Sequence, residues 1–337
     1  MGSALVGRIR ELRRRPLDEL LALAWDARRL NFEPVLGVSA PSPKVYRVAS
    51  FTNRPGKFVN ISVTGGRCAL RCEHCGGRLL KDMLPVSTPA RLVAVGRELR
   101  KKGCAGVLIS GGSLREGLVP LLPFTGAISE LRKMGLKVIA HTGLMDRATA
   151  WALREAGVMQ VLIDVIGDSR TIREVYHLRK KPQDFRKALH VAREAGLGLA
   201  PHILVGLYYG KVRGEYRALE YVTEARPEAI VIISLTRIRG TAMERTGTPP
   251  PGEVAKLIAV ARLLNPRTPL ILGCMRQSGP EKPLLEKLAV DAGANAIAYP
   301  LEETVRHARR RGLRAVFTEE CCSLMWPLLP LTGPSLS

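Results

Sequence analysis

Residues 58–75 read FVNISVTGGRCALRCEHC, and this stretch decides how the rest of the chain is interpreted. Its first part, 58–66, is an apolar, β-branched run that ends in two glycines, which predicts a buried strand followed by a tight turn. Cys68, Cys72 and Cys75 follow at once, with three and then two residues between them. The chain thus places three thiols at the carboxyl end of its first apolar strand.

Seven more apolar runs follow, at 106–112, 137–143, 158–168, 198–207, 229–236, 269–276 and 296–300. Near-continuous apolar runs are typical of parallel strands that are covered on both faces. Helical segments separate them, and each of six segments ends at a glycine suited to a helix C-terminus: Gly103, Gly135, Gly157, Gly196, Gly293 and Gly312. Eight strand–helix units predict an α/β fold, a (β/α)8 TIM-type barrel, with an open doubly wound sheet as the alternative. In both, the chemistry is expected at the carboxyl ends of the strands.

Three segments are expected along the chain. Residues 1–57 form an N-terminal part, with an Arg/Leu-rich amphipathic helical region at 4–30 and a Pro-rich, irregular lead-in after it. Residues 58–312 form the barrel, and residues 313–337 form a C-terminal extension with Cys321 and Cys322. Its first residues, LRAVFTEE, are expected to run extended and to carry the chain across the barrel mouth as a lid.

Composition limits the class of protein. The 337 residues are 46% hydrophobic but only 5% aromatic, so we expect a core of Leu, Val, Ile and Ala. No run approaches the roughly 18 apolar residues of a membrane span, and the N-terminus lacks the pattern of a secretory signal, so we expect a cytoplasmic protein with no membrane contact. The net charge of +22 would attract acidic partners. It is spread along the chain, so a solvated basic surface is the alternative.

The cysteine content points to metal chemistry. Seven cysteines, three of them within eight residues, indicate a cluster or metal site in a reducing compartment and not a disulfide framework. Three thiolates on one tight loop can bind three irons of a 4Fe–4S cluster and leave the fourth iron open to a small molecule. A zinc site would normally bring a fourth ligand in paired spacing. His74 is available, but it lies inside the loop.

This three-cysteine spacing after the first strand resembles the signature of the radical S-adenosylmethionine (SAM) superfamily. The resemblance implies that Cys68, Cys72 and Cys75 hold a primary 4Fe–4S cluster, that the open iron chelates SAM, and that electron transfer yields a 5′-deoxyadenosyl radical. His74 stands where this family usually has an aromatic residue.

Three further segments resemble parts of the same superfamily. The SGGS segment at 110–113 is similar to its Gly-Gly-Glu segment, with serine in place of Glu. The fourth apolar run aligns with the ribose-binding pattern of biotin synthase at Asp164, with Asp168 as the alternative. RGTAM at 239–243 is similar to the turn that flanks the adenine of SAM. The resemblance therefore implies a set of SAM-binding residues: Gly111, Gly112, Ser113, Asp164, Gly240 and Thr241.

The remaining cysteines suggest a second site. Cys274 ends the seventh strand, and Cys321 with Cys322 lies in the extension, so the three could hold an auxiliary 4Fe–4S cluster with Arg276 or Ser323 as a further ligand. Alternatively, Cys274 packs in the core and the adjacent pair is incidental. Cys104, before the second strand, is expected to be a small buried thiol.

Residues 201–222, 272–300 and 318–323 are similar to the two-component lipoyl synthases of archaea and some bacteria. The resemblance implies a sulfurtransferase that inserts sulfur into an octanoyl chain on an acidic lipoyl-carrier protein or H protein. It also implies a second radical SAM component and an electron donor as partners. The alternatives are biotin-synthase-like sulfur insertion, another radical SAM reaction such as hydrogenase-cofactor assembly or radical methylation, and an RNA-modifying protein. No motif with the interleaved aromatics of RNA binding is visible.

Overall fold

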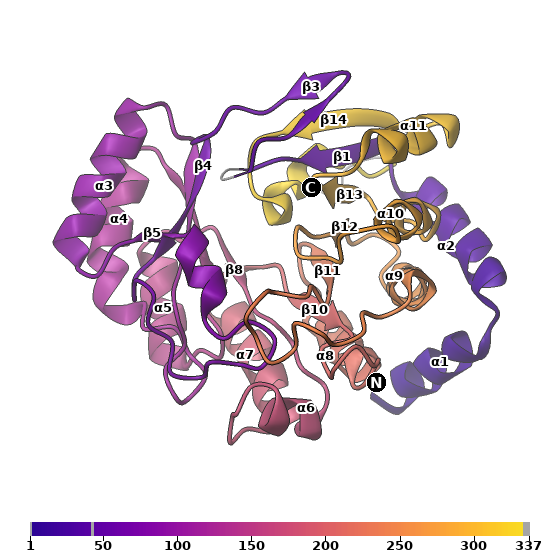
Figure 1. Ribbon diagram of the computed structural model, residues 1–337, viewed down its shortest axis with the longest axis horizontal. Helices are drawn as coiled ribbons and strands as arrows, with labels where there is room; N and C mark the ends of the chain where they lie inside the picture. Colours follow the sequence, from indigo (N-terminus) through magenta and orange to yellow (C-terminus); the bar gives the residue numbers. More distant parts are fainter. Residues whose placement is uncertain (1, 42–43, 333–337) are drawn as a thin grey trace.

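The computed structural model describes residues 2–41 and 44–332 (Figure 1). In this part of the chain, parallel strands form two six-stranded sheets, in the orders β5-β4-β6-β7-β8-β9 and β10-β11-β12-β13-β1-β14. The strands of the first sheet are β4 (Phe58–Ser62), β5 (Leu84–Pro85), β6 (Gly106–Ser110), β7 (Lys137–His141), β8 (Gln160–Leu162) and β9 (Gly198–Leu199). Those of the second are β1 (Val35–Ser39), β10 (His202–Val205), β11 (Ile230–Ser234), β12 (Leu270–Leu272), β13 (Ala296–Ala298) and β14 (Arg314–Thr318).

The two sheets meet where β8 lies beside β10. Asp164 and His202 form a parallel bridge, in which the backbone N–H of His202 donates to the Ile163 carbonyl at 2.8 Å and that of Val165 donates to the His202 carbonyl at 2.9 Å. The sheets therefore continue into one another as a curved wall of parallel strands (Figure 1). This is a barrel-type (β/α) fold, and all eight predicted strands are present in the predicted order.

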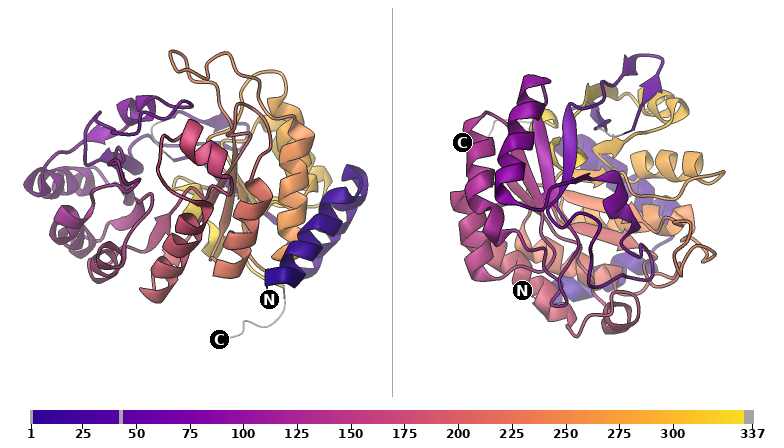
Figure 2. Two further views of the ribbon diagram at one scale, coloured as in Figure 1. Left: turned by 90° about the horizontal axis from the view of Figure 1, so that it is seen from below. Right: turned by 60° about the vertical axis from the view of Figure 1, so that its left-hand side comes forward.

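The helices lie outside the strands (Figures 1 and 2). They are α1 (Gly2–Arg14), α2 (Leu17–Asn31), α3 (Pro89–Lys101), α4 (Thr125–Lys133), α5 (Arg147–Glu155), α6 (Ser169–Glu174), α7 (Pro182–Glu194), α8 (Glu215–Ala225), α9 (Pro251–Leu264), α10 (Lys282–Asp291) and α11 (Glu302–Arg310). The six predicted cap glycines all have positive φ, between 72° and 84°, as an L-residue with a Cβ rarely does. No helix in residues 2–41 and 44–332 is long and apolar enough to cross a membrane.

The lead-in and the extension differ from the expectation. Residues 33–55 were expected to be irregular, but β1 lies at 35–39, fully buried, and pairs in parallel with both β13 and β14. A short antiparallel pair, β2 (Arg47–Val48) and β3 (Phe51–Thr52), follows it. The five-residue run VLGVS is too short to stand out in a Pro-rich stretch. It becomes a strand because the two neighbours satisfy its backbone groups.

The chain after β14 does not cover the mouth as a lid. It turns into the barrel in two 3-10 turns, η3 (Cys322–Leu324) and η4 (Trp326–Leu328). Leu324, Met325 and Leu329 are buried there among inward-facing strand residues such as Ile139 and Val231. The apolar side chains explain the difference, because an exposed lid would leave them in water.

Candidate functional site

The cysteine loop follows β4 and is tied to its neighbours through the backbone. The N–H of Ala69 donates to the carbonyl of Ser113 after β6, and the N–H of Glu73 donates to the carbonyl of Val175 after α6, both at 2.9 Å. Within the loop, the N–H of Gly76 donates to the Cys72 carbonyl at 2.7 Å. These bonds hold the three thiols in place at the carboxyl ends of the strands.

Two of the three thiols and His74 form a compact donor set. The ligand atoms of Cys72, His74 and Cys75 all lie within 4.8 Å of one another. The hydrogen bond between the Cys72 and Cys75 side chains raises the pKa of Cys72 well above its usual range and lowers the pKa of Cys75 to about 4. A thiolate is the form that binds metal, so the loop presents one even before a metal arrives.

The surroundings of the loop fit an iron–sulfur cluster. The buried Nδ1 of His74 has no hydrogen-bond partner among the described residues, although its ring stacks on Tyr176 with centroids 5.2 Å apart. Buried polar atoms without a partner are rare, so a bound group is expected beside this atom. Together with three thiols on one loop, this orphaned atom fits a 4Fe–4S cluster on Cys68, Cys72 and Cys75.

The SGGS segment lies directly against the loop. A Cβ on Gly112 would come within 1.9 Å of the Arg67 carbonyl oxygen and 2.6 Å of the Cys68 Cβ. Its N–H donates to Thr64 Oγ1 at 2.7 Å. A Cβ on Gly111 would meet only Thr64, at 3.0 Å. Glycine is therefore required at position 112, because the backbone at Arg67 and Cys68 approaches it closely. The neighbouring Ser113 carbonyl accepts the hydrogen bond from Ala69 N–H that holds the two segments together.

Asp164 faces the barrel interior beside two histidines. Its Oδ1 lies 3.5 Å from His141 Nε2, and the rings of His141 and His202 lie 5.7 Å apart. Burial alone would raise the pKa of Asp164, but the charge and hydrogen bond of His141 lower it to about 2. Burial lowers the pKa of His202 to about 4. The interior thus holds a charged carboxylate near neutral pH, suited to accept hydrogen bonds from hydroxyls.

Asp168 has a structural role instead. It is the N-cap of α6, where its carboxylate accepts from the N–H of Thr171 at 2.8 Å and from Arg213 Nε at 2.9 Å. Both bonds occupy the carboxylate outside the interior, which leaves Asp164 as the candidate for a ribose.

The turn after β11 reaches the cysteine loop from the other side. Arg78 Nε donates to the Gly240 carbonyl at 3.0 Å, and the Thr241 methyl lies 3.9 Å from the position of a Cβ on Gly76. The N–H of Met243 donates to the Glu73 carbonyl at 3.3 Å. Gly240 and Thr241 therefore lie next to the loop, as a SAM-flanking turn would have to.

Two other polar residues have structural explanations. Glu215 is the first residue of α8; burial raises its pKa to about 7, and it accepts from the N–H of Gly206 at 2.8 Å. Tyr208 donates to Glu174 at 2.9 Å and packs under Arg170 and Arg213. Tyr208 is thus satisfied by protein contacts, whereas the buried Oε2 of Glu215 has no hydrogen-bond partner among the described residues.

The fold brings Cys274, Cys321 and Cys322 together. Cys274 follows β12, and Cys322 has a hydrogen bond to the Cys274 backbone. The side chains of Cys321 and Cys322 are hydrogen-bonded, which lowers the pKa of Cys321 to about 7 and raises that of Cys322. Ser323 also donates to Cys321 Sγ at 3.5 Å. Cys274, which is exposed at its strand end, thus lies near Cys321 and the buried Cys322, although in the described residues only Cys72, His74 and Cys75 form a compact set of metal-ligand atoms.

Arg276 is not free to join them. Its guanidinium is buried and forms an ion pair with Glu286 at 2.5 Å, and it donates to the Gly273 carbonyl at 2.8 Å and to the Tyr299 carbonyl at 3.1 Å. Breaking a buried ion pair leaves an uncompensated charge, so the expectation of Arg276 as a cluster ligand is wrong in this conformation. Ser323 stays adjacent to the thiols.

Sequence analysis missed Lys44 and Tyr299 beside this second group of thiols. The Lys44 Nζ lies 5.7 Å from the centre of the Tyr299 ring, and its charge acts on Cys274. Tyr299 also donates to the Pro41 carbonyl and has a φ of 48°. Only folding brings the lead-in to this strand end. The single sequence signal was the tyrosine within the eighth apolar run.

One interior connects the two groups of thiols. Asp164 is close enough to His74 for that histidine to lower its pKa, and His141 is close enough to Cys321 for the thiol to raise the histidine pKa. Asp164 and His141 thus lie between the cysteine loop and the second group.

Comparisons with known proteins agree with this arrangement. Residues 62–211 match the family model described as the radical SAM superfamily. A biotin synthase of Xylella fastidiosa (strain 9a5c) is 28% identical over 301 residues, covering 84% of each chain, and one of Xanthomonas euvesicatoria pv. vesicatoria is 28% identical over 293 residues, covering 84% of this chain and 78% of its own.

Solved structures share the fold. Methylornithine synthase (PylB) superposes with a TM-score of 0.63 at 17% identity, covering 91% of this chain and 93% of its own. HydG, a maturase of the [FeFe]-hydrogenase, superposes with a TM-score of 0.62 at 15% identity, covering 97% and 78%.

Proposed function

We propose that this chain, whose residues 62–211 match the radical SAM superfamily, is a radical SAM enzyme and that it inserts sulfur into an unactivated C–H bond. The observation that carries the proposal is the second group of thiols, in which Cys274 lies near Cys321 and Cys322 and the latter two pack in the apolar cluster inside the barrel. Sulfur insertion needs a radical source and a sulfur source within reach of one carbon atom.

The roles of the residues follow from their positions. A cluster and SAM, when bound at Cys68, Cys72 and Cys75, supply a carbon radical that takes a hydrogen atom from the substrate. The backbone at Gly111 and Gly112 and the carboxylate of Asp164 would orient SAM. Cys274, Cys321 and Cys322 would hold an auxiliary 4Fe–4S cluster as the sulfur source, with Ser323 as a nearby oxygen donor.

Two acceptors are candidates. Relatives named biotin synthase, which cover 84% of the chain, favour biotin-type sulfur insertion. An octanoyl chain on an acidic lipoyl-carrier protein or H protein, modified together with a second radical SAM component, is favoured by three stretches similar to two-component lipoyl synthases. In the structure, those stretches include His202, which packs beside His141, and the Cys321–Cys322 pair, with Cys274 nearby at the end of its strand. The charge of +22 would steer an acidic carrier toward the enzyme.

The test compares two triple variants after anaerobic reconstitution. Cys68, Cys72 and Cys75 changed to Ala should abolish SAM cleavage. Cys274, Cys321 and Cys322 changed to Ala should lose about half of the roughly eight irons of two 4Fe–4S clusters, still form 5′-deoxyadenosine, and insert no sulfur. The single change Cys104→Ala is the matched control, because this thiol is fully buried and hydrogen-bonded to the Gly106 carbonyl at 3.2 Å.

Mass spectrometry of products then distinguishes the acceptors, with the octanoylated carrier, alone and with a second component, in one arm and the sulfur-free precursor of biotin in the other. Full iron content in the second triple variant would contradict the auxiliary cluster. Cleavage of SAM by the first would contradict the primary one.

A further inference from the structure

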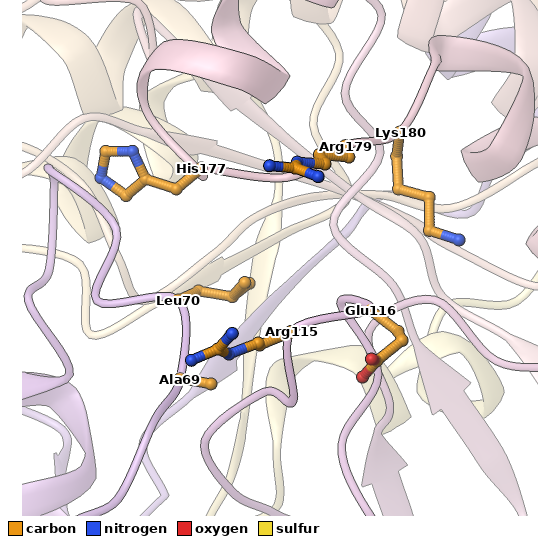
Figure 3. A pocket seen from close by; sticks show the side chains of 7 residues that line it. All are labelled: Ala69, Leu70, Arg115, Glu116, His177, Arg179 and Lys180. Atoms are coloured by element: carbon orange, nitrogen blue, oxygen red, sulfur yellow. The ribbon is translucent and has the colours of Figure 1, made fainter.

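A basic pocket of about 590 Å³ lies against the outer face of the cysteine loop. Figure 3 shows His177, Arg179 and Lys180 along one side and Ala69, Leu70, Arg115 and Glu116 along the other. The two sides come from the loop after α6, from the cysteine loop and from the loop after β6. The loops after α6 and β6 are also tied to the cysteine loop by the backbone hydrogen bonds described above.

The pocket carries an unbalanced positive charge. Arg115, Arg179 and Lys180 form no ion pair with a carboxylate in the described part of the chain, and Glu116 is the one acidic residue in the pocket lining. Arg67, Arg71 and Lys181, close by in sequence, are exposed as well. Cations left without partners on a surface favour a partner that brings its own negative charge.

The floor of the pocket is formed by the cysteine loop itself, in which Leu70 stands between Cys68 and Cys72. Leu70 is only 7% exposed and packs in the same apolar cluster as Cys68, Cys72 and Cys75. Across the pocket, the Tyr176 carbonyl lies 4.0 Å from Cys72 Sγ, and the next residue, His177, pairs with Glu73 at 3.0 Å. Because electron transfer slows steeply with distance, this short path makes the pocket a favourable entry point for an electron.

The pocket also lies outside the space that the reaction uses. A second pocket shares Glu116 and Lys180 and extends along α7 on the outside of the barrel. Asp164, His141 and the second group of thiols face the interior instead. A protein bound at the outer pocket would therefore leave the interior open to SAM and substrate.

We propose that this pocket is the docking site of a small acidic one-electron carrier protein that reduces the primary cluster through the outer face of the cysteine loop. The proposal rests on the radical SAM chemistry of the chain and is independent of which acceptor receives sulfur. The balance is one electron for each cleavage: the carrier is oxidised by one electron, and SAM with that electron gives methionine and the 5′-deoxyadenosyl radical.

An RNA partner would need other features. Recognition of single-stranded RNA usually relies on aromatic side chains on which bases stack, and no Phe, Tyr or Trp lines the pocket. A flat acidic protein surface needs no such platform, only complementary charge and a small apolar contact, which Leu70 and Ala69 provide.

The test uses a plant-type ferredoxin, an acidic carrier of low reduction potential, as the probe. The pocket variant carries Arg115→Glu, Arg179→Glu and Lys180→Glu. The matched control carries Arg10→Glu, Arg14→Glu and Arg310→Glu, which make the same change in net charge on α1 and α11, on the other side of the molecule (Figure 1). Binding is measured by calorimetry on reconstituted enzyme at several salt concentrations, and cleavage is measured with either reduced ferredoxin or dithionite.

We expect the pocket variant to bind ferredoxin about tenfold more weakly or worse, within the range by which electrostatic steering changes association. Its ferredoxin-driven cleavage should fall in step, while dithionite, a small reductant that needs no docking surface, should still support cleavage. The control variant should retain most of its binding, because charges far from the contact are screened beyond about 8 Å at physiological salt.

Equal loss of ferredoxin binding in both variants would show a general charge effect and overturn the proposed location, as would unchanged binding in the pocket variant. Loss of tRNA binding with retained ferredoxin binding would identify an RNA surface and overturn the proposal. If the pocket variant also loses dithionite-driven cleavage, the proposal is decided by the calorimetric affinity for ferredoxin of the neutral variant R115Q/R179Q/K180Q. Failure of sulfur insertion with ferredoxin-driven cleavage intact would count against the proposed function alone.

Discussion

Replacing Gly112 by alanine should displace Cys68 and disable the cysteine loop. The new Cβ would lie 1.9 Å from the Arg67 carbonyl oxygen and 2.6 Å from both Cα and Cβ of Cys68, so the two backbones must separate by about 1 Å. The neighbouring atoms are backbone and cannot rotate away. Overpacking of this kind costs about 1–3 kcal/mol of stability, and a displacement of about 1 Å at a reacting centre can lower the rate about 10²-fold.

The assay combines iron content after reconstitution, the thermal midpoint, and dithionite-driven formation of 5′-deoxyadenosine. Gly66→Ala is the matched control, because it lies in the same loop and its Cβ would meet nothing within 4 Å. Gly111→Ala should fall between the two, since its Cβ would meet only the Thr64 residue at 3.0 Å. If Gly112→Ala reconstitutes with the iron content and cleavage rate of Gly66→Ala, the close backbone contact does not position Cys68 and the reasoning fails.

Two other changes test the interior. Met325→Ala should destabilise the protein by about 2–5 kcal/mol in urea unfolding, because this fully buried side chain packs on Gly37 inside the barrel. The control Leu328→Ala, at a residue 43% exposed in the same segment, should cost much less stability. Equal losses of stability in the two variants would contradict the inward course of the chain. Asp164→Asn should lower the pKa of His141 in a histidine NMR titration. Burial opposes the charged form of His141, but Asp164 outweighs it and raises the pKa above 6.5, so this contribution to stability is complete below about pH 6.5 and is lost as the pH rises through the raised value. An unchanged titration would show that Asp164 is not the cause.

Local patterns in the sequence predicted much of the fold. Each apolar run of the barrel is a self-contained signal, because a parallel strand covered on both faces must be apolar along its length. The cap glycines are equally local, since positive φ depends on one residue. The lead-in shows the limit: VLGVS at 35–39 becomes β1 only because β13 and β14 bring backbone partners from 259 and 279 residues away.

The candidate site divides in the same way. The spacing of Cys68, Cys72 and Cys75 within one loop is a property of the sequence, because three thiols so close along the chain must also be close in space. The tertiary structure alone decided four other features. It brings Cys274 near Cys321 and Cys322, and it pairs Arg276 with Glu286. It also makes Asp168 a helix cap while Asp164 faces the interior, and it gathers unpaired cations over Leu70. The physical reason is that side-chain direction and long-range pairing depend on how distant segments pack, and no local pattern of residues encodes that packing.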